Sequence, residues 1–377
     1  MKTRIALSKP FFDADEIKEL RGVLDSGWVV KGPKVKEFED AVCKYLGVRH
    51  AIAVTNCTSA LHLALLGVGV SPGDEVLVAD YTYPATGHAV LHCAARPVFV
   101  DIDKRTYNID PGLIEKKITK KTKAIIPVHT FGQPARMDEI TALAGRRGLK
   151  VVEDAACALG AKYKNAPAGT FGDAGCFSLH GRKGVTTGEG GIVVTDNSRL
   201  AEKVRAMSAF GMQRPVAGKR RKAGGFCVSE FTEPGYNYKM SDITAAIGIA
   251  QLRKLDRIVS GRRALARYWD SRLKGIDLIS APYVDSKAAH IYQSYVALLD
   301  RRVDRDGIIS ALIGEGIQAN IGTYSSCMQP VYRSKDRCPD SKEVFNRAIA
   351  LPMHYQLKKK DIDLTVRVIK DALKEGS

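Results

Sequence analysis

The sequence predicts an α/β fold, with a large domain on a mostly parallel, doubly wound sheet and a smaller C-terminal α+β domain. Between residue 50 and about residue 195, short apolar runs alternate with amphipathic stretches. This alternation is typical of parallel strands with helices on both faces of the sheet. After about residue 245 the pattern changes to long helical segments. The 377 residues suffice for both units, and we expect the domains to cover 1–250 and 251–377.

The expected elements follow the chain in this order. Seven apolar runs are expected strands of the large sheet: 51–54, 75–79, 97–101, 123–128, 150–154, 176–179 and 191–195. Amphipathic segments between them are expected helices, among them 59–66, 111–118 and 137–147. The second unit is expected to contain one long connecting helix over 247–273, a strand within 291–299, and helices around 305–315 and over 360–374. Segment 212–235, rich in glycine, proline and charge, is expected to leave the sheet as an irregular loop.

Charge and cysteine usage limit the classes of function. Fifty-eight basic against 41 acidic residues give a net charge of +17, which favours anionic partners such as nucleic acid or a nucleotide-bearing substrate. The densest run, residues 219–222, lies between glycines and is typical of a solvated loop rather than of a DNA-reading helix. The eight cysteines form no C-x-x-C pair, so most are expected to be small buried hydrophobic residues. Without a signal peptide or an apolar membrane span, we expect a cytoplasmic protein with no membrane contact.

A lysine and an aspartate give the clearest chemical signal. Lys183 follows a short strand that carries Ser178, and a glycine-rich turn leads on to the next strand. A lysine at the exit of a buried strand can lose its proton and act as an amine nucleophile, although a surface lysine in a turn gives the same pattern. Asp154 ends an apolar strand, where it suits pairing with the protonated ring nitrogen of pyridoxal phosphate (PLP). A helix N-cap is the alternative for Asp154, whereas Glu153 should face the other side of the strand in a structural role.

A phosphate site and an aromatic ring are expected at the same edge of the sheet. Residues 55–62 form a strand-to-helix turn rich in hydroxyls, where Thr58 or Ser59 and the helix amides can hold a phosphate. Ordinary capping by hydroxyl side chains explains this turn equally well. Ser178 is the natural second phosphate ligand, and Tyr83 emerges after another strand as a candidate lid for a flat cofactor. Amine, carboxylate, phosphate turn and ring therefore converge at one edge.

The same segments resemble the DegT-type sugar aminotransferases, the nucleotide-sugar branch of the fold type I PLP enzymes. The matching blocks are 26–33, 56–63, 72–76, 100–103, 128–132, 153–156, 177–191 and 235–240. The resemblance extends from about residue 5 to residue 355, and the block around Lys183 together with Glu153-Asp-Ala-Ala156 is its most specific part. It implies transfer of an amino group, with glutamate as the expected donor, to a keto sugar carried by a nucleotide.

The resemblance also implies a role for each matching residue. Lys183 would bind PLP covalently, Asp154 would pair with the ring nitrogen, and Tyr83 would stack on the ring. The phosphate would be held by Thr58, Ser59 and Ser178. Asn237 matches a residue that reaches the phosphate site of the neighbouring subunit, which implies a homodimer with shared active sites. The expected substrate contacts are Trp28, Arg220, Arg221 and Tyr324.

Three alternatives accompany this interpretation. A PLP-dependent sugar dehydratase shares the fold, but such family members typically replace the lysine with histidine, so Lys183 favours transamination. A nucleic-acid-binding regulator is suggested only by the charge, without a helix-turn-helix, zinc finger or basic stripe. His88 and His92 share a helix spacing, but no third ligand or H-E-x-x-H motif accompanies them, so we expect no metal. Cys157 stands where the family often has Gln, His or Glu near the ring hydroxyl, which predicts a weaker contact there.

Overall fold

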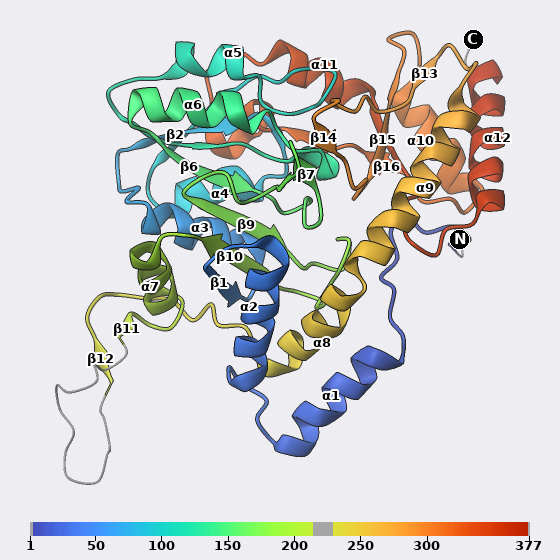
Figure 1. Cartoon of the computed structure of the whole chain (residues 1–377). Helices are drawn as coiled ribbons and strands as arrows, with labels where there is room; N and C mark the ends of the chain where they lie inside the picture. The colour runs from blue at the N-terminus through green and yellow to red at the C-terminus, as the bar shows by residue number, and fades with distance from the viewer. Residues whose placement is uncertain (1–2, 214–228, 376–377) are drawn as a thin grey trace, which may run out of the picture.

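The computed structural model describes residues 3–213 and 229–375 and has the expected α/β architecture (Figure 1). The main sheet has the strand order β1-β10-β9-β6-β5-β2-β4. Its strands are β1 (His50–Val54), β10 (Gly191–Thr195), β9 (Ala174–Ser178), β6 (Lys150–Asp154), β5 (Thr122–Ile126), β2 (Glu75–Ala79) and β4 (Arg96–Val100). All seven predicted strands are therefore present, with ends displaced by at most about two residues.

The directions of the strands decide which ends meet. From β9 to β4 all neighbouring strands are parallel, whereas β10 pairs antiparallel with both β9 and β1. Two reversals in a row mean that β1 and β9 run in the same direction. The carboxyl ends of β1, β9, β6 and β2 therefore share one edge, which is where ligands bind in sheets of this kind.

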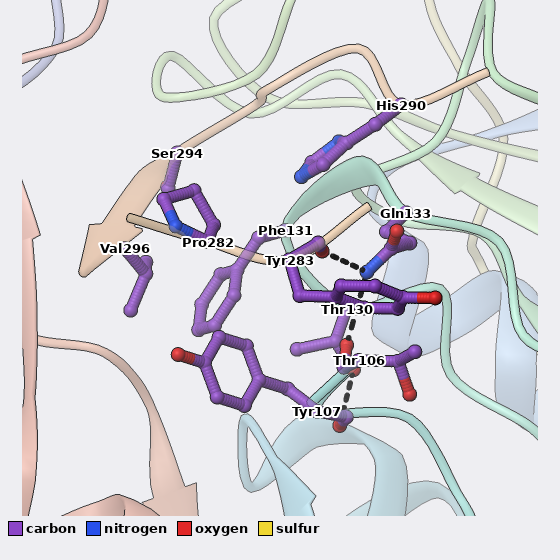
Figure 2. Close-up of a pocket in the computed structure, with 10 residues that line it drawn as sticks. All are labelled: Thr106, Tyr107, Thr130, Phe131, Gln133, Pro282, Tyr283, His290, Ser294 and Val296. Atoms are coloured by element: carbon purple, nitrogen blue, oxygen red, sulfur yellow. Dashed lines mark hydrogen bonds between the residues drawn. The ribbon is translucent and has the colours of Figure 1, made fainter. Parts of the chain in front are cut away.

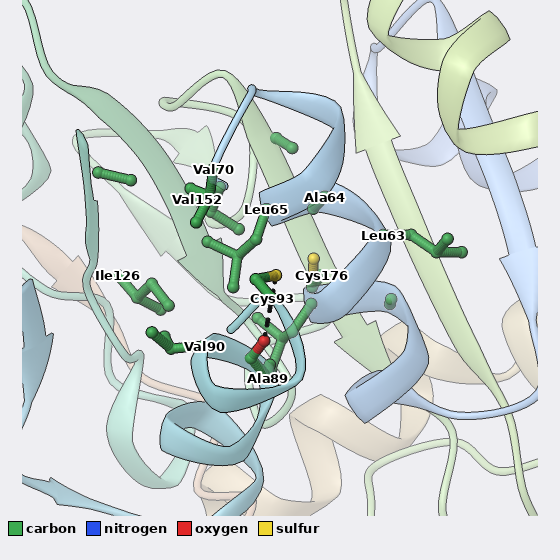
Figure 3. Close-up of a cluster of buried hydrophobic side chains, with 14 of the residues drawn as sticks. Leu63, Ala64, Leu65, Val70, Ala89, Val90, Cys93, Ile126, Val152 and Cys176 are labelled. Carbon is green, nitrogen blue, oxygen red and sulfur yellow. Dashed lines mark hydrogen bonds between the residues drawn. The ribbon is translucent and has the colours of Figure 1, made fainter. Parts of the chain in front are cut away.

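Helices cover both faces of the sheet. On one face, α3 (Cys57–Gly67), α4 (Ala85–His92) and α7 (Ser198–Met207) pack on inward side chains such as Ile52 and Val193. Figure 3 shows part of this cluster, in which Leu63 and Leu65 of α3 extend from different sides of the helix. The opposite face is covered by α2 (Pro33–Leu46), α8 (Asp242–Arg253) and α6 (Met137–Arg147).

The cysteines of the described segments are free thiols. Four of them, Cys57, Cys93, Cys176 and Cys338, are buried, as predicted for small hydrophobic residues. Cys43, Cys157 and Cys327 are half-buried. Cys227 lies outside the described residues, as does the basic run 219–222.

The predicted single helix over 247–273 is wrong, because the chain forms two helices there. Helix α8 ends at Arg253, and α9 (Leu255–Leu273) begins two residues later. At Lys254 the backbone has φ −98° and ψ −4°, outside regular helical values. The nearly buried ammonium of Lys254 contacts Asp13 and Glu16 at the start of α1 (Ala14–Ser26). Tertiary contact thus accompanies a break that the unbroken helical periodicity hides.

The expected helix over 111–118 is shorter than predicted. It divides into α5 (Pro111–Ile114) and a 3₁₀ turn over Glu115–Lys117. Of the expected loop over 212–235, residues 214–228 lie outside the described residues. The described ends form the short pair of β11 (Met212–Gln213) and β12 (Glu230–Phe231), which extends from the body of the molecule below α7 (Figure 1).

The C-terminal part has a sheet and a core of its own. The sheet order is β13-β15-β18-β16, from β13 (Ile279–Ser280), β15 (Tyr295–Leu299), β18 (Ala348–Leu351) and β16 (Asn320–Ile321). Helices α9, α10 (Arg305–Gly314) and α12 (Lys359–Glu375) supply Trp269, Leu312 and Ile369 to its core. Ile5 also lies in this part, where it bridges to Ile317. Within the described residues, no helix combines the length and the apolar character needed to cross a bilayer.

Candidate active site

The predicted phosphate turn lies at the shared edge, between β1 and α3. Asn56 caps α3, its side chain accepting a hydrogen bond of 2.8 Å from the Ser59 amide. The Ser59 hydroxyl is 3.3 Å from that of Thr55 and is largely buried, whereas Thr58 is half-buried. Amides of a first helical turn lack partners within the helix and attract anions. The turn is therefore built as an anion cradle as well as a cap.

Gly191 is the residue that lets β10 approach this turn. A Cβ atom added there would lie 2.3 Å from the carbonyl carbon and oxygen of Asn56 and 2.7 Å from the amide nitrogen of Cys57. These are backbone atoms, so they cannot rotate away. The glycine-rich stretch after Lys183 therefore sets the position of the phosphate turn, a role that the sequence pattern alone does not reveal.

Asp154 ends β6 with its carboxylate buried at the same edge. One oxygen accepts a 2.7 Å hydrogen bond from the Thr86 hydroxyl, and the other accepts one of 3.1 Å from the Ala156 amide. The Thr86 hydroxyl is in turn 2.9 Å from that of Thr82. Thr86 is thus a site residue that our sequence reasoning missed, although it lies three residues after Tyr83 in the segment that supplied the ring.

Lys183 reaches this group from the loop after β9. Its ammonium donates a 3.1 Å hydrogen bond to the Cys157 sulfur. Burial by itself would lower the pKa of Lys183, but interactions with Cys157, Cys57 and Asp154 outweigh it and raise the pKa. The sequence pattern indicated an amine that can lose its proton, whereas the neighbours of Lys183 in the structure favour its charged form.

Residues far along the chain hold the backbone of the lysine loop. The amide of Thr186 donates to the Gln251 side chain at 3.3 Å. The Arg182 carbonyl accepts a 2.9 Å bond from Gln293, and the Lys183 carbonyl accepts one of 3.4 Å from Arg262. Arg262 is only 2% exposed, and burial lowers the pKa of its guanidinium to about 10. The sequence gives no signal for these three partners, because they sit within ordinary helices or beside a strand.

Tyr83 stands at the mouth of a pocket beside the lysine loop. Its ring is 67% exposed and lies 6.2 Å from the ring of Tyr324. Both tyrosines line the pocket with Arg182, the residue before Lys183, and with Gln293. The structure therefore brings Tyr83 and the predicted substrate contact Tyr324 together. The short pairing of β3 (Tyr81–Thr82) with β17 (Tyr324–Ser325) fixes this arrangement.

Other predicted residues lie apart from this group. Trp28 is 55% exposed on the segment before α2, where its indole donates to the Lys31 carbonyl at 3.3 Å. Asn237 is exposed and accepts a hydrogen bond from Lys239 in a segment that runs beside the end of β1. Arg220 and Arg221 lie outside the described residues. In the described part of the chain, the group at the shared edge thus contains neither Trp28 nor Asn237.

Glu153 has the structural role predicted for it. Its buried carboxylate accepts hydrogen bonds of 2.6 to 2.8 Å from the amides of Gly169, Phe171 and Gly172, and it lies 2.9 Å from His129. It therefore fixes a loop on the face of the sheet away from Asp154's partners.

His88 and His92, the histidines considered as metal ligands, both pack against other rings. The His88 ring lies 5.6 Å from that of Tyr332, and the His92 ring lies 5.6 Å from that of His62. Burial, the largest cause, lowers the pKa of His62 to about 4. The two rings therefore pack on different neighbours instead of converging on one point.

A second pocket lies under the loop that carries Tyr283. Figure 2 shows its lining, where the Gln133 amide donates to the carbonyls of Tyr283 and Thr106. Phe131 and Tyr107 have positive φ values of 55° and 64°, which are uncommon for such side chains. The predicted site residues that the structure describes do not line this pocket, so it is separate from the candidate site.

The residues at the shared edge fit PLP. The cofactor has an anionic phosphate, a ring nitrogen to be held protonated, and an aldehyde that combines with an amine. The α3 cradle, the carboxylate of Asp154 and the amine of Lys183 match these three groups in chemistry. Ser178, buried at the end of β9, adds a hydroxyl.

Comparisons with known proteins agree with this arrangement. The model of the DegT/DnrJ/EryC1/StrS aminotransferase family matches residues 10–370. The spore coat polysaccharide biosynthesis protein SpsC of Bacillus subtilis (strain 168) is 38% identical over 97% of this chain and 96% of its own length.

Two solved structures share the whole fold. Spr1654 from Streptococcus pneumoniae in its PLP-form has a TM-score of 0.91 at 28% identity and covers 99% of both chains. PseC from Helicobacter pylori, an aminotransferase involved in the biosynthesis of pseudoaminic acid, has a TM-score of 0.90 at 26% identity over 98% of this chain and 99% of its own. The chain therefore belongs to the DegT/DnrJ/EryC1/StrS aminotransferase family and is a PLP-dependent aminotransferase.

Proposed function

We propose that this enzyme transfers an amino group to the keto group of a nucleotide-linked sugar, with glutamate as the donor. The observation that carries the proposal is the meeting of Lys183, Asp154 and the α3 cradle beside a pocket lined by Tyr83 and Tyr324. The likeness to SpsC and PseC supports a sugar substrate. The net charge of +17 suits a substrate that carries a diphosphate.

Each residue of the group is given one task. Thr58, Ser59 and Ser178 hold the phosphate, Asp154 keeps the ring nitrogen protonated, and Tyr83 covers the ring. Bound PLP supplies an electron sink for the carbon that loses a proton. Lys183 moves that proton between the substrate carbon and the C4′ carbon of the cofactor as general acid and base.

One of the proposed substrate contacts, Tyr324, lines the same pocket. Tyr324 lies beside Tyr83 across the β3–β17 pair. Trp28, Arg220 and Arg221 are proposed to approach the site from segments outside this group. For Trp28, the support is its exposed ring on a loop whose end is fixed by hydrogen bonds from the Gly32 and Val35 amides to Asp242.

We also propose a cytoplasmic homodimer with shared active sites and a division of the chain into domains 1–250 and 251–377. The exposed side chain of Asn237, on a segment that pairs with the end of β1, supports a contact with a neighbouring subunit. Separate hydrophobic cores at the two ends of α9 support the two domains, since Leu255 packs in the core of the main sheet and Trp269 in the C-terminal core.

A substrate panel tests the proposed function. Purified holoenzyme is mixed with glutamate and each of several nucleotide-linked keto sugars, and both 2-oxoglutarate and the amino sugar are measured. We expect the two products in equal amounts with at least one sugar, and none with the Lys183→Ala variant. Formation of 2-oxoglutarate with simple keto acids but with none of the sugars would refute the substrate class.

Borohydride reduction tests the assignment of Lys183 separately. Reduction of the holoenzyme should fix the cofactor to the protein, and peptide mass spectrometry should place the adduct on Lys183. An adduct on another lysine would refute the assignment whatever the substrate is.

A further inference from the structure

Two cysteines and an aspartate meet at the edge of the main sheet. The sulfurs of Cys327 and Cys338 and a carboxylate oxygen of Asp80 all lie within 4.8 Å of one another. Cys338 and Asp80 are buried, and Cys327 is half-buried. A disulfide bond holds its sulfurs about 2.05 Å apart, so the two side chains have to move towards each other to form one.

The cysteines stand at the two ends of a surface loop that lies on β4 and on the Tyr83 segment. Within it, the Tyr332 hydroxyl donates to the Pro84 carbonyl at 2.8 Å, and the Asp336 carboxylate accepts from the Phe99 amide at 2.9 Å. The Cys338 sulfur is 3.9 Å from the Phe99 carbonyl oxygen. The loop is thus held at defined points, which keeps the two sulfurs within 4.8 Å of each other.

We propose that Cys327 and Cys338 form a reversible disulfide when the enzyme meets a small-molecule disulfide oxidant. The Cys327 thiolate attacks one sulfur of the oxidant, giving a mixed disulfide and releasing one thiolate. The Cys338 thiol then gives its proton to that thiolate and attacks the Cys327 sulfur. The second thiolate leaves and takes up the proton that Cys327 gave to the solvent when it ionised. The protein loses two electrons and two protons, and the oxidant is reduced to two thiols.

The environments of the two sulfurs suit these different roles. A hydrogen bond from Cys338, the largest contribution, lowers the pKa of Cys327 against the effect of burial, and Ser325 assists it. The same interaction, followed by burial, raises the pKa of Cys338. Cys327 is therefore the thiol that ionises first, and it is also the more accessible of the two.

The state of Asp80 favours a disulfide over a bound metal ion. One carboxylate oxygen accepts a 2.6 Å hydrogen bond from the Cys327 amide, and the other accepts one of 2.6 Å from the Ser325 hydroxyl. Both oxygens are thus already used in holding the turn that carries Cys327. A tetrahedral metal would also need a fourth ligand beyond these three groups.

Disulfide formation would reach the active site through a short series of contacts. Movement of Cys327 towards Cys338 strains the hydrogen bond that its backbone amide donates to Asp80. It also strains the neighbouring pairing of β17 with β3. That pair aligns Tyr324 with Thr82, and Thr82 contacts Thr86, the donor to Asp154. We therefore expect the linked enzyme to turn over more slowly, with full recovery on reduction.

Peptide mapping of the oxidised holoenzyme tests the proposal. The enzyme is treated with glutathione disulfide, blocked with N-ethylmaleimide and digested with trypsin, which cuts after Arg333, Lys335 and Arg337 and so separates the two cysteines. We expect a cross-linked pair of peptides that dithiothreitol releases. The link should be absent in Cys327→Ser and unchanged in Cys43→Ser, a control at another half-buried cysteine.

Three results would overturn the proposal. The first is recovery of Cys327 and Cys338 as free thiols under conditions that oxidise Cys43. The second is zinc that copurifies at about one ion per chain and whose removal by a chelator is needed before either thiol reacts, which would make the cluster a metal site. The third is a linked enzyme with the turnover of the reduced one, which would remove the coupling to the active site.

Discussion

Replacing Lys254 with methionine tests how the N-terminal helix is attached to the rest of the enzyme. The Lys254 ammonium, 7% exposed, lies 2.6 Å from the Asp13 carboxylate and 2.7 Å from that of Glu16. Removing one partner of a buried ion pair costs about 3–5 kcal/mol. Glu16 keeps hydrogen bonds from Gln251 at 2.6 Å and from the Asp13 amide at 2.9 Å. We therefore expect Lys254→Met to lower the free energy of unfolding by the smaller value of that range, about 3 kcal/mol.

The assay is guanidinium unfolding at pH 7, with Arg253→Met as the matched control. Arg253 is the neighbouring residue and also binds a carboxylate, that of Glu19 at 2.8 Å, but its side chain is 57% exposed. Exposed pairs contribute at most about 1 kcal/mol, so the control should unfold close to the wild type. A Lys254→Met midpoint that equals the control would refute the idea that the buried cluster fixes α1.

The pH dependence gives a second check on the same variant. Burial raises the pKa of Glu16, but hydrogen bonds from the Asp13 amide, Lys254 and Gln251 outweigh it and lower the pKa below its ordinary value. A carboxyl with a lowered folded pKa stabilises the protein above its unfolded pKa, about 4.3, and this contribution is lost as the pH falls through the folded pKa. The difference in the free energy of unfolding between the wild type and Lys254→Met should therefore become smaller below about pH 4. A constant difference in the free energy of unfolding from pH 7 to pH 3.5 would contradict the idea that Lys254 stabilises the ionised carboxylate of Glu16.

Four further predictions concern the active site. Asp154→Asn should slow turnover by several orders of magnitude while leaving the far-ultraviolet circular dichroism unchanged, because the ring nitrogen loses its charged partner; near-normal turnover would show that another group holds that proton. Gly191→Ala should weaken PLP binding by about tenfold to a hundredfold, since its Cβ would displace the Asn56 backbone; equal affinities in a fluorescence titration would refute this. Changing Arg220 and Arg221 to alanine should raise the KM for the sugar substrate, more so at low salt, without altering the half-reaction with glutamate. An unchanged KM for the sugar would show that these arginines are solvated side chains that do not bind the substrate. Double-reciprocal plots of initial rate against sugar concentration, measured at several glutamate concentrations, should be parallel lines. This is expected when 2-oxoglutarate leaves before the sugar binds, and intersecting lines would contradict that order.

The elements that the sequence predicts well are those whose signal is local. The strand at 150–154 and the helix at 137–147 have the observed bounds, because burial of a strand and of one helix face leaves a direct periodicity in the residues. The proximity of Lys183 to Asp154 also follows from local reasoning, since Asp154 ends β6 and Lys183 follows β9, a parallel neighbour whose carboxyl end shares the same edge.

What the sequence hides are the contacts that join distant segments. The break at Lys254 depends on partners in α1 about 240 positions earlier in the chain, and lysine itself is a good helix former, so no local residue marks it. The start of α2 is similar. Its N-cap, Gly32, offers no side chain, and the carboxylate of Asp242 accepts the amides of Gly32, Lys34 and Val35 instead. A cap supplied from another helix leaves no pattern near the helix that it stabilises.

The lysine loop shows how the two kinds of information combine at the active site. The motif around Lys183 identifies the reactive amine, but three hydrogen bonds hold its backbone, and their partners are Gln251, Arg262 and Gln293. All three follow the main sheet in the chain, in α8, in α9 and just before β15. A movement of these later elements would therefore displace the amine relative to Asp154, which is fixed on β6 by Thr86. The chemistry is thus carried by the first half of the chain, and its alignment depends on the second.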